Sequence, residues 1–147
     1  MVLLVSCKNE PKQEEQKEEK QESLEPVSNE AMESAVIYEA NIRQYSPEGT
    51  FEEFTKDIPQ LKELGVKVIW LMPVYPISMK NRKAKGDLSV EDIEDEEERK
   101  KYLGSYYAIA DYTDVNPEFG NFDDFENLVE TAHNNGMYVI LDWVANH

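Results

Sequence analysis

Residues 138–147 read YVILDWVANH and are the most informative stretch of the chain. The run starts as YVIL, an apolar pattern typical of a buried strand. It then ends in Asp142, Asn146 and His147, whose polar groups are costly to bury without hydrogen-bond partners. We therefore expect a strand that starts in a core and whose carboxyl end opens onto a polar site.

Two earlier segments have the composition of strands in the same sheet. Residues 66–74, VKVIWLMPV, are almost continuously apolar and rich in β-branched residues, which is typical of a parallel strand covered on both faces. Residues 35–46, AVIYEANIRQYS, alternate in polarity, which predicts a strand that leaves the core and enters a polar site. The alternation sets Val36, Tyr38, Ala40 and Ile42 against Ile37, Glu39, Asn41 and Arg43.

Helical patterns lie between successive strands. Thr50 begins a helix with capping-box spacing, and Gly65 is placed to end it. Pro59 lies inside this helix and is expected to bend it or split it into two pieces. A second helix is predicted from Asn121, a good N-cap, to residues 134–136, NNG.

The order strand, helix, strand, loop, helix, strand predicts an α/β fold with right-handed crossovers and a parallel sheet. Three parallel strands alone leave their edges and one face uncovered. A barrel of eight strand–helix units takes about 250 residues. We therefore predict that residues 34–147 form the first three strand–helix units of a (β/α)8 TIM barrel, and that the chain is a truncated part of one.

A long polar segment separates the second strand from the second helix. Within it, residues 87–102 read DLSVEDIEDEEERKKY and are strongly acidic. We expect an exposed helix over residues 90–102. Such an insertion either shapes access to a site or has no role, and we favour the second reading.

The N-terminal part of the chain predicts no core. Residues 8–33 are rich in Glu, Lys, Gln and Ser and contain no aromatic residue, so we expect a disordered charged linker. Residues 1–7, MVLLVSC, resemble a truncated lipobox of bacterial lipoproteins, which implies that Cys7 carries lipid. The alternative is a frayed apolar terminus with an idle thiol. The resemblance implies anchoring to the bacterial cell envelope, at the periplasmic or the outer-membrane surface.

Charge and composition exclude several classes of partner. The net charge of −16 and the lack of a basic stripe argue against nucleic acid. No run approaches the ~20 apolar residues that a spanning helix needs, so the membrane is expected to be reached only through the lipid anchor. Cys7 is the single cysteine, which excludes an intrachain disulfide.

From about residue 36 to the end, the chain resembles the α-amylase family, glycoside hydrolase family 13, and most of all the lipoprotein α-amylases of Bacteroidetes-type bacteria. Four blocks carry the resemblance in the order of that family. They are IYEANIRQYSPEGTFEEF (37–54), LKELGVKVIWLMPVYPI (61–77), LGSYYAIADYTDVNPEFGNFDDF (103–125) and AHNNGMYVILDWVANH (132–147), the last ending in an Asp-x-x-x-Asn-His signature.

The resemblance implies roles for individual residues. Asp142 matches the carboxylate that supports the active-site floor near the catalytic nucleophile; the alternative is a salt bridge at a strand end. His147 matches a histidine that hydrogen-bonds the sugar beside the scissile bond. Tyr107 matches a tyrosine that stacks on the same sugar, although Tyr106 is an alternative in the alignment. Both tyrosines are otherwise loop aromatics that cover a core.

The resemblance also implies a calcium ion in many family members, with Asn146 as one ligand. Amide oxygens suit calcium, but the ion takes about 6–8 oxygen ligands, and some family members lack the site. The alternative for Asn146 is capping of a turn. Calcium is therefore a possible cofactor.

The implied activity is hydrolysis of α-1,4-glucosidic bonds in starch-like α-glucans or maltooligosaccharides, with retention of configuration. In the family, the aspartate nucleophile and the glutamic acid/base lie on later strands, so we expect this chain alone to be inactive. The alternatives are an α-1,6-glucosidase, a pullulanase or a transglycosylase of the same family, or a non-catalytic sugar-binding lipoprotein with a degenerate barrel.

Overall fold

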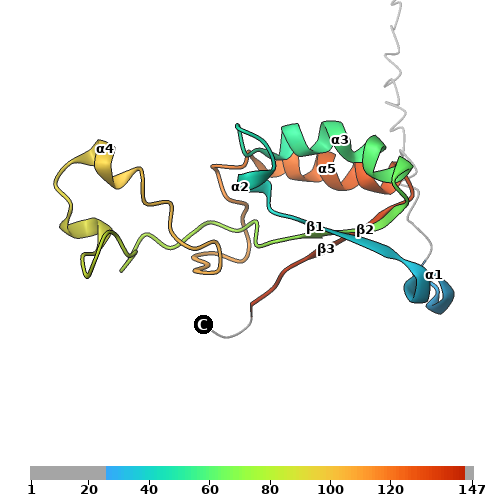
Figure 1. The fold of residues 1–147 in the computed structure, drawn as a ribbon, viewed down its shortest axis with the longest axis horizontal. Helices are drawn as coiled ribbons and strands as arrows, with labels where there is room; N and C mark the ends of the chain where they lie inside the picture. The colour runs from blue at the N-terminus through green and yellow to red at the C-terminus, as the bar shows by residue number, and fades with distance from the viewer. Residues whose placement is uncertain (1–25, 145–147) are drawn as a thin grey trace, which may run out of the picture.

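A computed structural model describes residues 26–144, and its centre is a three-stranded sheet covered on one face by helices (Figure 1). The strands are β1 (Val36–Ala40), β2 (Val66–Leu71) and β3 (Tyr138–Leu141), paired in parallel in the order β1-β2-β3. Helices α3 (Phe51–Glu63) and α5 (Phe122–Asn134) lie side by side over the sheet. The prediction of an α/β fold with parallel strands is confirmed.

Helix α3 begins and ends where the sequence predicts. Thr50 Oγ1 accepts a hydrogen bond from the Glu53 amide at 3.3 Å. At the other end, Gly65 takes a φ of 84°, a left-handed conformation that glycine adopts without strain. The helix runs unbroken through Pro59, so the predicted split does not occur. Proline removes one backbone hydrogen bond, and the buried face of α3 outweighs this loss; that face consists of Phe51, Phe54, Ile58 and Leu61.

Helix α5 is fixed by a capping box at Asn121. The Asn121 side chain accepts from the Asp124 amide at 3.1 Å, and Asp124 Oδ2 accepts from the Asn121 amide at 2.8 Å. The start of α5 then packs on α3, because the ring of Phe125 lies edge-on to that of Phe51, 5.6 Å between centroids. The predicted N-cap is confirmed.

The first strand is shorter than predicted. It ends at Ala40, and residues Ile42–Tyr45 form the short helix α2. Ile42 is buried, whereas Val36 is half exposed. Alternating polarity alone does not show where a strand ends. A short helix that follows the strand, as α2 does here, can also place its first apolar side chain in the core.

The acidic insertion is also less regular than predicted. Instead of one helix over residues 90–102, it forms a 3-10 turn, η1 (Val90–Asp92), and a single helical turn, α4 (Glu96–Arg99). Two competing caps explain the break. Ser89 caps the first turn, and the Asp95 side chain accepts from the amides that start the second.

The end of the predicted linker is helical. Its last residues form helix α1 (Asn29–Ser34), which is exposed and contains the good helix formers Glu30 and Met32. Helix α1 therefore overlaps residues 29–33 of the predicted linker. Residues 8–25, together with Cys7, Asn146 and His147, lie outside the described residues. Within residues 26–144, no helix is long and apolar enough to cross a bilayer.

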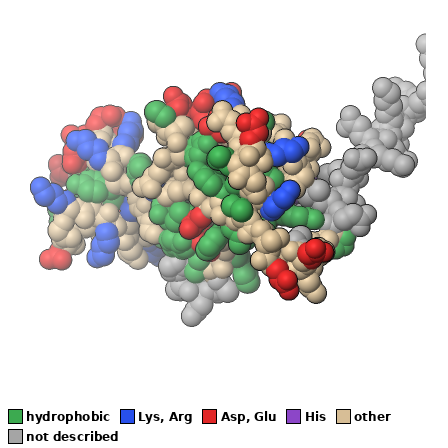
Figure 2. Space-filling view, turned by 45° about the vertical axis from the view of Figure 1, so that its right-hand side comes forward, with side chains coloured by type: hydrophobic (Ala, Val, Ile, Leu, Met, Phe, Trp, Pro, Cys, Tyr) green, Lys and Arg blue, Asp and Glu red, His purple; other side chains and the backbone are tan. Residues whose placement is uncertain are grey.

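The two faces of the sheet differ. On the helix-covered face, Ile69 and Leu71 are fully buried. On the opposite face, Ile37 and Ile140 are 55% and 45% exposed. Figure 2 shows hydrophobic side chains gathered in the middle of the molecule and mixed charges over the end that carries α4. The core therefore lies between the sheet and the helices α3 and α5.

Candidate active site

The parallel register brings the carboxyl ends of the three strands to one edge of the sheet. The pairing continues one residue past each strand: the Met72 amide donates to Ala40 O at 3.0 Å, and the Asp142 amide donates to Leu71 O at 2.9 Å. Asp142 is thus held by its own backbone at the edge where parallel-stranded enzymes carry their chemistry.

A returning loop brings a second set of side chains to this edge. Ile77, which follows β2, forms an antiparallel bridge with Ile109. Flanking backbone hydrogen bonds reinforce the bridge, from Ser78 N to Ala108 O at 2.7 Å and from Ala110 N to Pro76 O at 2.8 Å. Residues 105–110 therefore lie against the segment that leaves the sheet.

Tyr107 meets Asp142 at this point. The Tyr107 hydroxyl donates to Asp142 Oδ2 at 2.9 Å, across 35 residues of sequence. This hydrogen bond, with desolvation and the negative charge of Asp142, raises the pKa of Tyr107 to about 12. The phenol consequently stays protonated and donating at every pH near neutrality. Two residues that the sequence predicts for one site do lie in contact.

Tyr106, the alternative to Tyr107, has a different environment. Its ring lies 5.2 Å from that of Tyr107, and the guanidinium of Arg43 sits 5.6 Å from its centroid. The carboxylate of Asp111 is used within its own turn, where it accepts from Thr113 Oγ1 at 2.7 Å and from Thr113 N at 2.8 Å, and these bonds lower the pKa of Asp111. Of the two tyrosines, Tyr107 is the one that contacts Asp142.

Three further aromatic side chains lie beside the predicted residues, and the sequence reading did not select them. The ring of Tyr112 is 5.4 Å from that of Tyr75 and 6.3 Å from that of Trp143. The Tyr112 hydroxyl donates to the carbonyl of Val144. Trp143 is 67% exposed. All three aromatics lie in the sequence blocks that resemble the family, and this position was the signal by which they could have been selected.

The described residues supply no obvious metal centre. Across residues 26–144, no three His, Cys, Asp or Glu side chains gather in a way that could hold an ion. Asn146, the predicted calcium ligand, and His147 lie outside the described range, so their predicted roles stay predictions.

Comparison with known proteins identifies the family. The family model described as "Alpha amylase, catalytic domain" matches residues 12–147. The chain belongs to the α-amylase family. The three strands and their covering helices are thus part of an α-amylase catalytic barrel, and the predicted fold class is confirmed.

Individual relatives support the α-amylase assignment. Alpha-amylase SusG of Bacteroides thetaiotaomicron is 34% identical over 99 residues, covering 67% of this chain and 11% of SusG. The alpha-1,4-glucan:maltose-1-phosphate maltosyltransferase of Cereibacter sphaeroides is also 34% identical over 99 residues, covering 65% of this chain and 16% of that enzyme. The crystal structure of an alpha-amylase from Lactobacillus plantarum aligns with a TM-score of 0.63 and 40% identity, over 77% of this chain and 23% of that one. The chain therefore spans less than a quarter of each.

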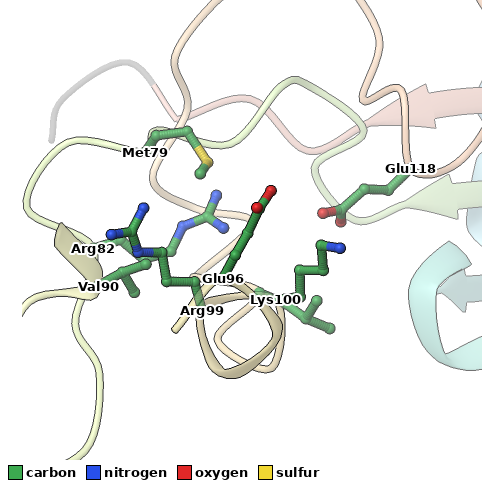
Figure 3. Close-up of a pocket in the computed structure, with 8 residues that line it drawn as sticks. Met79, Arg82, Val90, Glu96, Arg99, Lys100 and Glu118 are labelled. Carbon is green, nitrogen blue, oxygen red and sulfur yellow. The ribbon is translucent and has the colours of Figure 1, made fainter. Parts of the chain in front are cut away.

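A cavity lies away from the Tyr107–Asp142 contact of this α-amylase-family chain, between the acidic insertion and Glu118. Its volume is about 400 Å³, and it is bordered by charged and aliphatic side chains (Figure 3). Its lining residues are Met79, Arg82, Val90, Glu96, Arg99, Lys100, Leu103 and Glu118. None of them is aromatic, so the cavity offers no ring on which a sugar stacks.

The Tyr107–Asp142 contact predicts a pH effect. In Asp142→Asn, the charge that favours the neutral phenol is lost, so the pKa of Tyr107 should fall from about 12 toward its ordinary value of about 10. By linkage, the raised pKa adds stability below pH ~10 that is lost as the pH rises through ~12. NMR titration of ring-labelled tyrosine, assigned with Tyr107→Phe, measures this. Asp111→Asn is the control, and an equal fall in both variants would contradict the contact.

Proposed function

We propose that this chain is part of an enzyme that hydrolyses α-1,4-glucosidic bonds of starch-like α-glucans or maltooligosaccharides with retention. One observation carries the proposal: Tyr107 and Asp142, which match a sugar-stacking tyrosine and a site-floor carboxylate, are hydrogen bonded at the carboxyl edge of the sheet. The name of SusG, an α-amylase, agrees with this substrate class.

The residues of this chain account for only part of the proposed hydrolysis. Retaining glycosidases use a carboxylate nucleophile and a carboxylic acid/base about 5–5.5 Å apart. Neither matches a position in residues 1–147, so we propose that this chain alone binds sugar without cleaving it. Asp142 supports the floor of the site, Tyr107 stacks on the sugar, and His147 hydrogen-bonds its hydroxyls.

The hydrogen bond to Asp142 suits Tyr107 for stacking. A ring whose hydroxyl is fixed at one end has less rotational freedom to lose when a pyranose packs on its face, so less binding energy is spent on ordering. Because the phenol is a donor to Asp142, the carboxylate keeps its second oxygen for another partner. The pair thus combines a stacking face with an acceptor.

Transglycosylation is the second candidate, because a maltosyltransferase matches the chain as well as SusG does over the same number of residues. Both reactions pass through a glycosyl-enzyme intermediate and differ in whether water or a sugar hydroxyl attacks it. An α-1,6-glucosidase or pullulanase would differ in the bond cleaved. A non-catalytic sugar-binding lipoprotein would keep the sugar contacts and lack both carboxylates.

Sugar binding by the full 147-residue chain tests the main proposal. We expect maltoheptaose binding, measured by isothermal titration calorimetry, to weaken about two- to tenfold in Tyr107→Ala, since an aromatic contact contributes about 0.5–1.5 kcal/mol. Tyr102→Ala is the matched control, because the Tyr102 hydroxyl hydrogen-bonds Glu98 in the insertion and alanine keeps the backbone carbonyl that Arg82 contacts. Equal weakening in both variants would contradict the role of Tyr107, and maltoheptaose cleavage above background would contradict the proposed inactivity.

We propose calcium as a cofactor, with Asn146 as one ligand. Amide oxygens suit a hard cation, and the remaining oxygens of its ~6–8 would have to come from other residues. A ligand that binds only the folded state raises the melting temperature. Millimolar calcium should therefore raise the melting temperature of the wild-type chain and not that of Asn146→Ala. A rise of equal size in both would remove Asn146 from the site.

We further propose that Cys7 carries a lipid that anchors the protein to the bacterial cell envelope. The support is the apolar run before Cys7 and the charged segment after it. When the protein is expressed in a bacterial host, Cys7 should incorporate a labelled fatty acid and Cys7→Ser should not. Labelling of the serine variant, or none of the wild type, would refute the anchor.

A further inference from the structure

The side chain of Arg43 hydrogen-bonds the loop that carries Tyr107, about 60 residues away in the sequence. Arg43 Nη1 donates to Gly104 O at 3.0 Å, and Nη2 lies 3.5 Å from Leu103 O and 3.4 Å from Glu118 Oε2. Its guanidinium also lies over the ring of Tyr106. The side chain is only 16% exposed. A charged group so buried is costly unless several partners compensate.

A second arginine holds the same loop from another direction. Arg82 Nη1 donates to Tyr102 O at 3.2 Å, and its Nε donates to Ser78 O at 3.2 Å. Gly104 lies in close contact with Arg82: a Cβ on Gly104 would stand 2.6 Å from Arg82 Nε. Gly104 also takes a φ of 73°, which favours glycine. The backbone carbonyls of residues 102–104 are therefore held in succession by two arginines.

Tyr107 follows this clamped segment through a tight turn. The Tyr107 amide donates to Ser105 Oγ at 3.2 Å, and the Ala108 amide donates to Ser105 O at 2.9 Å. The turn leaves few free dihedral angles between Gly104 and the ring of Tyr107. A displacement of the Gly104 backbone should therefore also displace the Tyr107 ring.

We propose that Arg43 is a positioning residue of the α-glucan site: by holding the backbone of Leu103 and Gly104, it places Tyr107 where its ring faces the sugar and its hydroxyl reaches Asp142. That the positioned tyrosine binds an α-glucan rests on the proposed function. That Arg43 positions Tyr107 rests on the contacts alone. Arg43 itself touches neither Asp142 nor the Tyr107 hydroxyl, so it acts through the loop.

The chemistry of arginine suits this task. Its planar guanidinium donates in several fixed directions at once, here to two carbonyls and a carboxylate. Lysine carries the same charge as a single point and cannot reproduce that fork. Arg43→Lys therefore keeps the charge and loses the geometry, whereas Arg43→Gln loses both.

The sign of a pKa change separates positioning from simple charge. Removing a nearby cation makes an anionic phenolate less favourable, so charge loss alone would raise the pKa of Tyr107. Loss of positioning would instead separate the phenol from Asp142 and lower that pKa toward the ordinary value of about 10. The two explanations thus predict opposite shifts in Arg43→Gln.

The experiment is an NMR titration of ring-labelled tyrosine in the full chain, wild type against Arg43→Gln and Arg43→Lys. We expect Tyr107 to titrate at about 12 in the wild type and near about 10 in both variants. Tyr45 is an internal control for folding, because burial and its hydrogen bond to Asp57 keep its pKa raised when the core is intact. Arg99→Lys is the matched control, since Arg99 donates to Ile93 O within the insertion and should leave Tyr107 unchanged.

Several results would overturn the proposal. The first is a Tyr107 pKa that stays at about 12 or rises in either Arg43 variant. The second is a Tyr107 pKa that already has its ordinary value in the wild type. The third is a fall of the Tyr107 pKa in Arg99→Lys as large as in the Arg43 variants. A parallel maltoheptaose titration should show affinity falling by at most the two- to tenfold expected for loss of the Tyr107 contact in both Arg43 variants. If the wild-type chain binds no maltoheptaose, the proposed function fails, while the tyrosine titration still decides whether Arg43 positions Tyr107.

Discussion

The parallel pairing of β1, β2 and β3 is the constraint on which the rest of the structure depends. The pairing places Asp142 next to the end of β2, through its amide bond to Leu71 O. The buried faces of α3 and α5 fix which side of the sheet faces the core, so Ile69 is buried while Ile140 is half exposed. In an eight-stranded barrel the uncovered face is the packed interior. The sheet edge is thus left for chemistry.

The long connection between β2 and α5 is held differently from the core. Its two ends are anchored in the core by Val74, Val115 and Phe119. The part between them is held by the bridge between Ile77 and Ile109 and by the arginines Arg43 and Arg82. Its exposed ion pairs, such as Lys100 with Glu97, contribute little, because solvent screens them. Polar contacts to backbone carbonyls therefore determine where the aromatic side chains stand. Such a loop can change its substrate contacts without changing the sheet.

The parts that local sequence predicts well are those with local causes. The caps at Thr50 and Asn121 were predictable, since each is made by residues within one helical turn. Tyr107 and Asp142 were assigned to one site only because both residues match a known family, and their direct hydrogen bond was not predicted. The contacts of Arg43 with a loop 60 residues away have no local signature. The continuity of α3 through Pro59 has none either.

We propose that a glucan binds at the carboxyl edge of the sheet, against the ring of Tyr107 and beside Asp142. Chemical-shift mapping of the full chain with maltoheptaose tests this proposal. We expect the largest changes to fall on Tyr107, Asp142 and the residues that flank them. Changes confined to the cavity beside Arg99, or none at saturating sugar, would contradict it.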